Sequence, residues 1–348
     1  MSVLVRNLVF GVLAAALSAC SQGPAEPTPT EAAEAKPVES TTWRPFSDDS
    51  PWNTPIPKEA RTDPNSDAMI AEFARGGALY INIKEWSVPI FYIDLEATPK
   101  HDVIDLYENR IGRGFEQPRA IPIPNDAGPS GPASGTGYMA IVDKDRHLEW
   151  DLKQAFLRED GLWFMGFGAV TNLRGSGVSK PWDEAEKPVY AASALPSGFP
   201  LSAGLIRVDE VKAGRINHAL MFAYPGVRPN AFVPPASTAL VGDAASGAPK
   251  VGMPLGARIQ LDPAFNVERS DLSPQGKVIA RALQEYGAYL GDAAGGNVLF
   301  AEAAPDKLAE WEGILASGDL QAVFSPQMMK GYMRVVDMGE VRPGQPAP

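Results

Sequence analysis

Glycine and proline interrupt this chain so often that long regular helices have little room to form. The sequence contains 33 glycines and 33 prolines among 348 residues. Both residue types disfavour helix interiors, because glycine is conformationally free and proline lacks the amide hydrogen that a helix needs. The 45% apolar content still supplies a substantial core. We therefore predict a mainly β protein, a large β-sandwich or jelly-roll-like domain with two or three peripheral helices.

Charge and cysteine content exclude several classes of function. With a formal net charge of −11 and a single cysteine, the chain is not expected to be a nucleic-acid binder, a disulfide scaffold or a cysteine-ligated metalloprotein. Its three histidines are far apart in the sequence, and it has no P-loop, G-x-G-x-x-G, G-x-S-x-G, H-E-x-x-H or EF-hand motif. We expect no metal ion, no other cofactor and no nucleic-acid partner.

The first twenty residues have the pattern of a bacterial export signal. Arg6 precedes a short apolar run that ends in Leu-Ser-Ala-Cys20, which is too short for a membrane-spanning helix. These four residues resemble the lipobox of bacterial lipoproteins. The resemblance implies that residues 1–19 are removed, that Cys20 is acylated, and that Ser21 directs the protein to the outer membrane. We expect a cell-envelope protein held on the membrane by this anchor; an ordinary secretory signal is the alternative.

The rest of the chain consists of three segments that differ in composition. Residues 20–42 are rich in proline and glutamate and contain no aromatic side chain, which predicts a disordered spacer after the lipidated cysteine. Residues 43–341 alternate aromatic-bearing apolar runs with turn signals, which predicts one globular domain. Residues 342–348 are expected to fray.

Short apolar or alternating segments bounded by turn residues predict the strands. They cover residues 78–83, 88–94, 137–143, 147–152, 162–170, 205–209, 216–224, 257–261, 297–301 and 332–338. The charged segment 143–146 predicts a hairpin turn between two of them.

Three segments have the spacing of helices. Ser66 is expected to cap a helix over 67–75, Ser273 to cap one that begins at Pro274 and continues to 290, and Pro305 to begin a shorter one. The segments 118–136 and 176–198 contain too many glycines and prolines for regular structure. Loops of that length are often functional, so we expect them to form the walls of a cleft.

A strand over 147–152 gives the first candidate site. Alternation places His147, Glu149 and Asp151 on one face. Successive same-face residues lie about 6.6 Å apart, and glycosidases mount their two carboxylates at roughly 5–10 Å. We predict Glu149 as the catalytic acid or base, with Asp151 in contact with substrate. The alternative is an ordinary solvated sheet face.

The segment 204–224 gives the second candidate site. We expect two strands around a charged turn, with His218 on the second strand as a group that exchanges a proton near neutral pH. We predict His218 or Asp209 as the catalytic partner of Glu149. If the glycan is uronic, a lyase reaction is possible, with His218 as the base and Arg215 or Asn217 neutralising the substrate carboxylate. A core histidine with both nitrogens hydrogen-bonded, and a solvated turn at Asp209 and Glu210, are the alternatives.

Two aromatic residues complete the predicted site. Trp182 lies in a proline-rich loop and is expected to be exposed, where its ring can stack on a sugar. Tyr286 is expected to orient the substrate.

Several motifs occur together between residues 50 and 292. They read SPWNTPI over 50–56, GLIRVDEV over 204–211, GRINHAL over 214–220, GARIQL over 256–261 and ALQEYG over 282–287. This set resembles a largely uncharacterised group of secreted bacterial proteins, some of which are found among carbohydrate-associated proteins. The resemblance covers most of residues 43 to about 320, and the segment 178–198 is longer and more charged than in that group. Its matching positions are Glu149, Asp209, His218, Tyr286 and Asp292.

Together these features predict an envelope lipoprotein that binds and cleaves a polysaccharide, as a glycoside hydrolase rather than a lyase. The net charge of −11 favours a neutral glycan over a polyanionic one. A non-catalytic glycan-binding or assembly lipoprotein is the alternative. The enzyme hypothesis requires Glu149, Asp151 and His218 to face one hollow.

Overall fold

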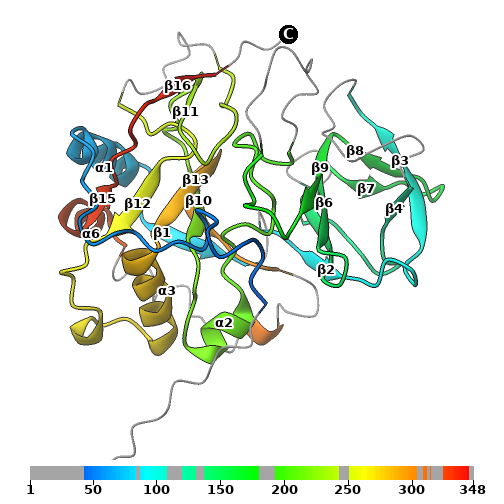
Figure 1. Ribbon diagram of the computed structural model, residues 1–348, viewed down its shortest axis with the longest axis horizontal. Coiled ribbons are helices and arrows are strands. Elements are labelled where there is room, and N and C mark those ends of the chain that lie inside the picture. Colours follow the sequence, from blue (N-terminus) through cyan, green and yellow to red (C-terminus); the bar gives the residue numbers. More distant parts are fainter. Residues whose placement is uncertain are drawn as a thin grey trace, which may run out of the picture. The chain divides into compact units, whose positions relative to one another are not determined.

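A six-stranded mixed sheet is the largest element of the fold (Figure 1). Its strands, in spatial order, are β1 (Leu79–Asn82), β14 (Asn297–Phe300), β10 (Leu220–Tyr224), β13 (Ala288–Ala293), β12 (Arg258–Leu261) and β15 (Met333–Val335). The pairs β1–β14 and β10–β13 are parallel and the others are antiparallel. Strands that are neighbours in this sheet come from distant parts of the sequence, so its core depends on long-range contacts.

The computed structural model describes residues 43–83, 87–107, 120–130, 137–179, 193–242, 251–303, 309–311, 314 and 324–344. By their contacts, residues Ser40–Pro348 form one unit, and all of the described elements belong to it. Within the described residues, no helix is both long and apolar enough to cross a membrane.

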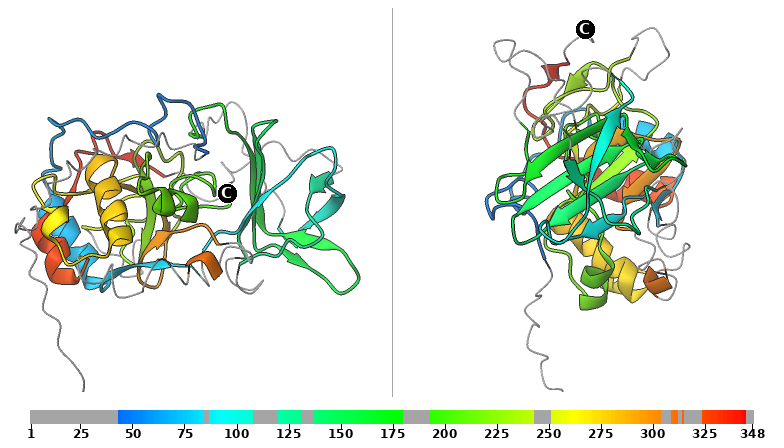
Figure 2. Two further views of the ribbon diagram at one scale, coloured as in Figure 1. Left: turned by 90° about the horizontal axis from the view of Figure 1, so that it is seen from below. Right: turned by 90° about the vertical axis from the view of Figure 1, so that its right-hand side faces the viewer.

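The helices pack around one half of the six-stranded sheet (Figure 2). They are α1 (Ser66–Arg75), α2 (Val208–Ala213), α3 (Pro274–Glu285), α6 (Pro326–Tyr332) and the short 3₁₀ turn η2 (Val267–Arg269). Helix α1 contacts α6 and β15, α3 contacts β12, and α2 contacts α3. Their apolar faces and the sheet form the main core, which includes Trp52, Phe73 and Phe222.

Two four-stranded sheets enclose a second core. One contains β2 (Ile90–Tyr92), β5 (Met139–Asp143), β6 (Leu148–Lys153) and β9 (Phe167–Asn172); the other contains β4 (Ala120–Pro122), β3 (Lys100–Asp105), β8 (Trp163–Met165) and β7 (Phe156–Leu157). Side chains from both sheets, among them Val103, Ile141, Trp150 and Trp163, pack together between them. A two-stranded ribbon of β11 (Ala231–Phe232) and β16 (Arg342–Pro343) completes the strands.

The prediction of a strand-rich fold is confirmed. The fold is mixed α/β, with several mixed sheets, one of them curled into a half-barrel. The predicted hairpin is present, since β5 pairs with β6 across the turn at residues 144–147. The predicted strand 162–170 is two strands, β8 and β9. The strands β3, β4, β7, β11, β13 and β16 were not predicted.

Three local predictions are wrong. Residues 205–209 do not form a strand, because helix α2 begins at Val208. The helix predicted to continue to 290 ends at Glu285, and the chain turns at Gly287 into β13. Ser66 does not cap α1 through its side chain; instead its hydroxyl accepts a hydrogen bond from the amide of Val335. The cap predicted at Ser273 is confirmed by its hydrogen bond from the Gly276 amide.

Gly161 and Gly256 have the same backbone φ but differ in how closely other atoms approach them. Gly161 and Gly256 both have φ of +85°, but a Cβ at Gly161 would meet no atom within 4 Å, whereas one at Gly256 would lie 1.8 Å from the Val233 carbonyl oxygen. We expect Gly161→Ala to lower the free energy of unfolding by about 1–2 kcal/mol. Gly256→Ala adds the clash and is expected to cost about 3–5 kcal/mol. Urea unfolding of both variants tests this, and equal losses would contradict it.

Candidate functional site

The sheet that contains β6 is buried on both of its faces. On one face, Trp150 and Leu152 belong to the second core. On the opposite face, Ala140 and Val142 of the neighbouring strand β5 belong to the main core. A strand in this position has no solvated face, so the alternating acidic residues of β6 are forced into the interior.

Glu149 and Asp151 form a fully buried carboxyl pair. Both side chains have an exposed fraction of 0%. The Ser202 amide donates to Glu149 Oε1 at 2.8 Å, and the Ser202 hydroxyl donates to Oε2 at 2.5 Å. The Leu201 amide donates to the Asp151 carboxyl oxygens at 3.2 and 3.3 Å. The pair therefore joins β6 to the backbone at residues 201–202.

Burial and proximity favour a single proton on the pair. Burial raises the pKa of Asp151 well above its ordinary value, and the neighbouring Glu149 raises it further. Burial also raises the pKa of Glu149, while hydrogen bonds from Asp151 and Ser202 act in the opposite direction. The raised pKa of Asp151 favours its protonated form as the donor to Glu149, because two unneutralised charges in the interior would be far more costly.

His218 lies in a second buried group, built around the start of α2. It precedes β10 rather than lying on it. Its Nε2 is 3.1 Å from Glu210 Oε2, and its Nδ1 is 2.9 Å from the Ala219 carbonyl oxygen. Arg207 donates to the other Glu210 oxygen at 2.8 Å. Both nitrogens of His218 are therefore hydrogen-bonded within the core, with the side chain only 4% exposed.

The electrostatics of this group are set by its mutual pairing. Burial by itself raises the pKa of Glu210, but the Arg207 guanidinium and then His218 lower it below its ordinary value. The Arg207 guanidinium also lies 5.6 Å from the ring centroid of Trp43. Glu210, which the sequence analysis weighed as part of a solvated turn, is thus the carboxylate beside His218. Asp209, a predicted catalytic partner of Glu149, is exposed on the first turn of α2.

Three of the predicted substrate-binding residues, Arg215, Asn217 and Tyr286, form a third, separate group. Arg215 donates to the Asn217 side chain and pairs with Glu285 at 3.2 Å. Tyr286 is buried, and burial and then Glu285 raise its pKa. Among the described residues, no hydrogen bond or ion pair joins these side chains, or His218, to the carboxyl pair on β6. Trp182 and Cys20 lie outside the described residues.

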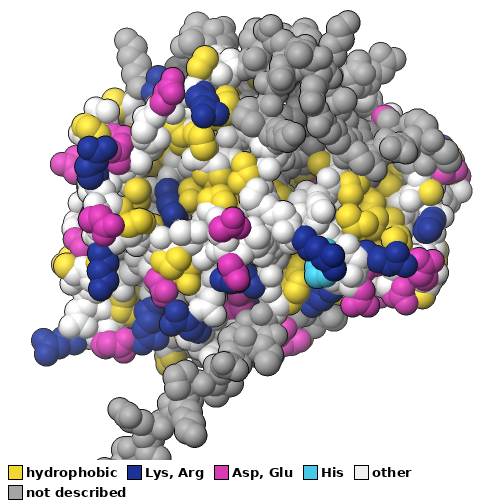
Figure 3. Space-filling model, viewed as in Figure 1, with side chains coloured by type: hydrophobic (Ala, Val, Ile, Leu, Met, Phe, Trp, Pro, Cys, Tyr) yellow, Lys and Arg dark blue, Asp and Glu magenta, His cyan; other side chains and the backbone are white. Residues whose placement is uncertain are grey.

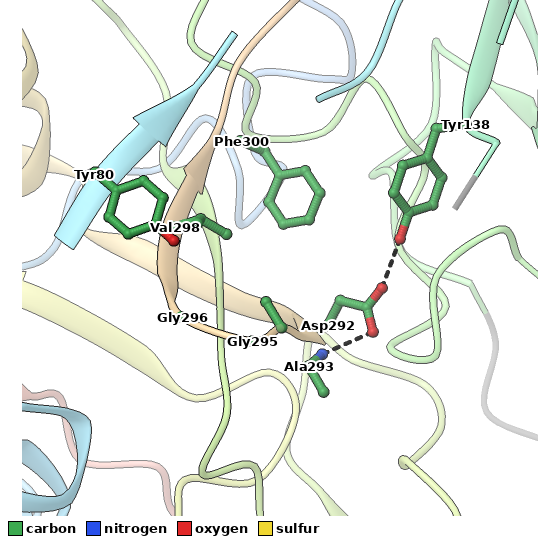
Figure 4. A pocket seen from close by; sticks show the side chains of 9 residues that line it. Tyr80, Tyr138, Asp292, Ala293, Gly295, Gly296, Val298 and Phe300 are labelled. Atoms are coloured by element: carbon green, nitrogen blue, oxygen red, sulfur yellow. Dashed lines mark hydrogen bonds between the residues drawn. The ribbon is translucent and has the colours of Figure 1, made fainter. Parts of the chain in front are cut away.

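A pocket of about 550 Å³ lies at the end of the six-stranded sheet (Figure 4). Its described lining residues are Tyr80, Tyr138, Asp292, Ala293, Ala294, Gly295, Gly296, Val298 and Phe300. The rings of Tyr80 and Phe300 come from β1 and β14, and Asp292 stands at the end of β13. Pockets of this size hold small organic ligands.

Asp292 and Tyr138 form the polar side of this pocket. The Tyr138 hydroxyl donates to Asp292 Oδ2 at 2.7 Å, and the Ala293 amide donates to Oδ1 at the same distance. Burial, followed by the Asp292 carboxylate, raises the pKa of Tyr138. The phenol therefore keeps its proton and acts as a donor.

A β-bulge directs the Asp292 side chain toward the pocket. Between β10 and β13, Phe222 pairs with Leu290 but Ala223 pairs with Asp292, so Gly291 is an extra residue on β13. A bulge of this kind changes the direction of the side chain that follows it. A Cβ at Gly291 would lie 2.6 Å from the Met221 sulfur, so glycine leaves room for the Met221 side chain.

Lys153 connects the pocket to the strand that carries the carboxyl pair. It is the last residue of β6, and its Nζ lies 3.5 Å from Asp292 Oδ2. Its ammonium group is also 5.3 Å from the ring centroid of Tyr138. Asp292 is therefore contacted by a phenol, an ammonium group and a backbone amide.

Other described parts of the chain give weaker evidence of a binding site. No group of three or more His, Cys, Asp or Glu residues in the described ranges is arranged to hold a metal ion. On the face drawn in Figure 3, Lys and Arg side chains are interspersed with Asp and Glu rather than gathered by sign. A smaller pocket of about 290 Å³ beside α3 is lined by Arg215, Arg281 and Glu285.

The motif that contains Trp52 and Asn53 has a structural role. The Asn53 amide donates to three carbonyl oxygens, of Pro45, Phe46 and Ser47. The Trp52 ring is 1% exposed and packs edge-on against Phe199 and Tyr289.

The chain matches no protein-family model, no curated protein sequence and no solved structure at a significant level. The resemblance to secreted bacterial proteins therefore stays a prediction.

Sequence reasoning missed Tyr138, Lys153 and Ser202, although two of them had a detectable signal. Lys153 continues the alternation of Glu149 and Asp151 along the same face. The hairpin predicted at 143–146 pairs Met139 with Leu152, which brings Tyr138 next to Lys153. Nothing local in the sequence indicates that Ser202 meets Glu149, 53 residues away.

The shared proton predicts that the isosteric substitutions Asp151→Asn and Glu149→Gln differ in their effect on the free energy of unfolding. Asp151→Asn keeps a donor toward Glu149 and an acceptor for Leu201, so we expect the free energy of unfolding at neutral pH to change by less than about 1 kcal/mol. Glu149→Gln places an amide N–H opposite the Ser202 amide and hydroxyl, which are themselves donors. It is expected to lower the free energy of unfolding by about 1–3 kcal/mol.

The same pair predicts how stability depends on pH. The folded-state pKa of Asp151 is raised, so its contribution is complete below the unfolded pKa and is lost as pH rises through the folded pKa. Urea unfolding at several pH values is expected to show this loss in the wild type and not in Asp151→Asn. Equal slopes in the two proteins would contradict the shared proton.

The group at α2 predicts a contrast between adjacent acids. Glu210→Gln removes the buried carboxylate that Arg207 and His218 both contact and is expected to lower the free energy of unfolding by about 3–5 kcal/mol. Asp209→Asn, on the exposed side of the same turn, is expected to cost less than about 1 kcal/mol. Thermal or urea unfolding measures both, and a larger loss for Asp209→Asn would overturn this assignment.

Proposed function

We propose that this chain is a carbohydrate-binding protein of the bacterial cell envelope, and that the pocket beside Asp292 holds a sugar ring of a neutral glycan. The observation that carries the proposal is the combination, in one pocket of about 550 Å³, of aromatic rings and a carboxylate. Sugar rings present apolar C–H faces that pack on aromatic rings and hydroxyls that donate to carboxylates.

Three features of the pocket support this ligand class. The Tyr80 ring is 38% exposed and is available for stacking. Asp292 accepts one hydrogen bond at each oxygen from the protein, and Oδ1 has a further lone pair for a ligand hydroxyl. Lys153 neutralises the Asp292 charge, which suits an uncharged ligand.

We favour binding over cleavage. Glycoside hydrolysis uses two carboxyl groups that contact the substrate. Asp292 is the one carboxylic acid among the described residues that line the pocket, and Glu149 and Asp151 are fully buried against residues 201–202. The non-catalytic alternative weighed from the sequence is therefore the better match to this geometry. The sandwich-type scaffold, the acylation of Cys20 and the outer-membrane location stay predictions from the sequence.

Two pocket variants and one matched control test the proposal against a panel of neutral and acidic polysaccharides. We expect Tyr80→Ala to weaken binding about 5- to 10-fold, from the loss of stacking, and Asp292→Asn to weaken it about 10- to 100-fold, from the loss of charge-assisted hydrogen bonds. Tyr332 has a similar exposed fraction, 41%, but does not line the pocket, so Tyr332→Ala is expected to bind like the wild type.

Isothermal titration calorimetry with the purified protein measures these affinities, and a reducing-end assay detects any turnover. Binding that survives both pocket substitutions would refute the assignment of the site. The absence of binding to every glycan in the panel would refute the carbohydrate proposal itself.

A further inference from the structure

One face of β6 links the buried carboxyl pair to the pocket. Residues two apart on a strand point the same way, so Glu149, Asp151 and Lys153 form one row on β6. The first two bond to the backbone of residues 201–202, and the third lies 3.5 Å from Asp292. A change at the carboxyl pair therefore has a short route to a residue that lines the pocket.

We propose that Glu149 and Asp151 are positioning residues for the pocket: their hydrogen bonds with the Leu201 and Ser202 amides fix β6 against residues 201–202 and leave Lys153 paired with Asp292. This inference rests on the proposed function of the pocket. When the proton of the pair is lost, two negative charges face each other in the interior. Lys153 is then drawn from Asp292 toward the ionised Asp151, and the pocket loses its neutral, ordered carboxylate.

Within the described part of the chain, Lys153 is the cation that shares a strand face with the pair. The residues in register with the pair on the flanking strands are uncharged: Ala140, Val142, Ala169 and Thr171. The covering segment contributes backbone amides and the hydroxyl of Ser202. Of the charged or titratable residues along β6, His147 precedes the strand and Lys153 ends it. Asp143, at the end of β5, accepts from amides of the hairpin turn instead.

The direction of the pH response follows from the geometry and from burial. Burial and the neighbouring Glu149 raise the pKa of Asp151, so the shared proton is retained above the ordinary range of an aspartic acid and is lost as pH rises further. Ligand affinity is therefore highest on the acidic side of that transition and falls on the alkaline side.

Ligand-free NMR on the full chain tests the positioning role without any glycan. Between about pH 5 and about pH 10, we expect the protection factors of the Leu201 and Ser202 amides to fall at least tenfold, together with a shift of the Asp292 carboxyl ¹³C resonance. In Asp151→Asn both readouts are expected to stay constant. In Lys153→Met the amides respond as in the wild type, but the Asp292 response is lost.

The matched control is Glu96→Gln, which removes an exposed acid paired with Arg146 on the surface and is expected to titrate like the wild type. Constant protection in the wild type over the whole range, or an Asp151→Asn protein that titrates like the wild type, would overturn the proposal.

Glycan affinity at the two ends of the range separates this inference from the proposed function. We expect at least tenfold weaker binding at the alkaline end for the wild type and constant affinity for Asp151→Asn. If no glycan binds at any pH while the NMR readouts respond as expected, the carbohydrate assignment fails and the positioning of Lys153 stands. If a glycan binds with the same affinity at both ends, the positioning role is refuted and the carbohydrate assignment stands.

Discussion

The burial of one sheet on both faces is the constraint on which the rest of this structure depends. The sheet β2-β5-β6-β9 lies between two hydrophobic cores, so the alternation of β6 places Trp150 in one core and Glu149 and Asp151 on the side of the other. Acids in such a position are tolerated when a proton and hydrogen bonds neutralise them. The shared proton and the amides of residues 201–202 meet that requirement, and they tie the sheet to the main core.

The same requirement explains the group at the start of α2. Arg207, Glu210 and His218 are almost fully buried, and each contacts another member of the group. Their pairing neutralises the charges where the chain enters the helix and where it approaches β10. Glu149 and His218, which the sequence analysis predicted as catalytic, thus form their hydrogen bonds with other groups of the protein. Among the described residues, Asp292 and Tyr138 are the polar pair that lines the pocket of about 550 Å³.

The sequence predicted local structure better than it predicted the site. Alternation and turn residues located β5, β6 and the hairpin between them, and the Ser273-Pro274 signal located the start of α3. Periodicity could not show that the polar face of β6 is covered, because the covering residues, Leu201 and Ser202, are about fifty positions away. The bulge at Gly291, which aims Asp292, likewise depends on pairing between distant strands. The core-histidine alternative for His218 matches the observed contacts, since both ring nitrogens are bonded.

The protonation state of the carboxyl pair is the most direct test of this account, and infrared difference spectroscopy can measure it without any ligand. At neutral pH the wild type is expected to show the C=O stretch of a protonated carboxylic acid that is shielded from solvent exchange, and the Asp151→Asn protein is expected to lack this band. A wild-type spectrum without the band, or one in which the band survives the substitution, would mean that Glu149 and Asp151 are not held together by a shared proton.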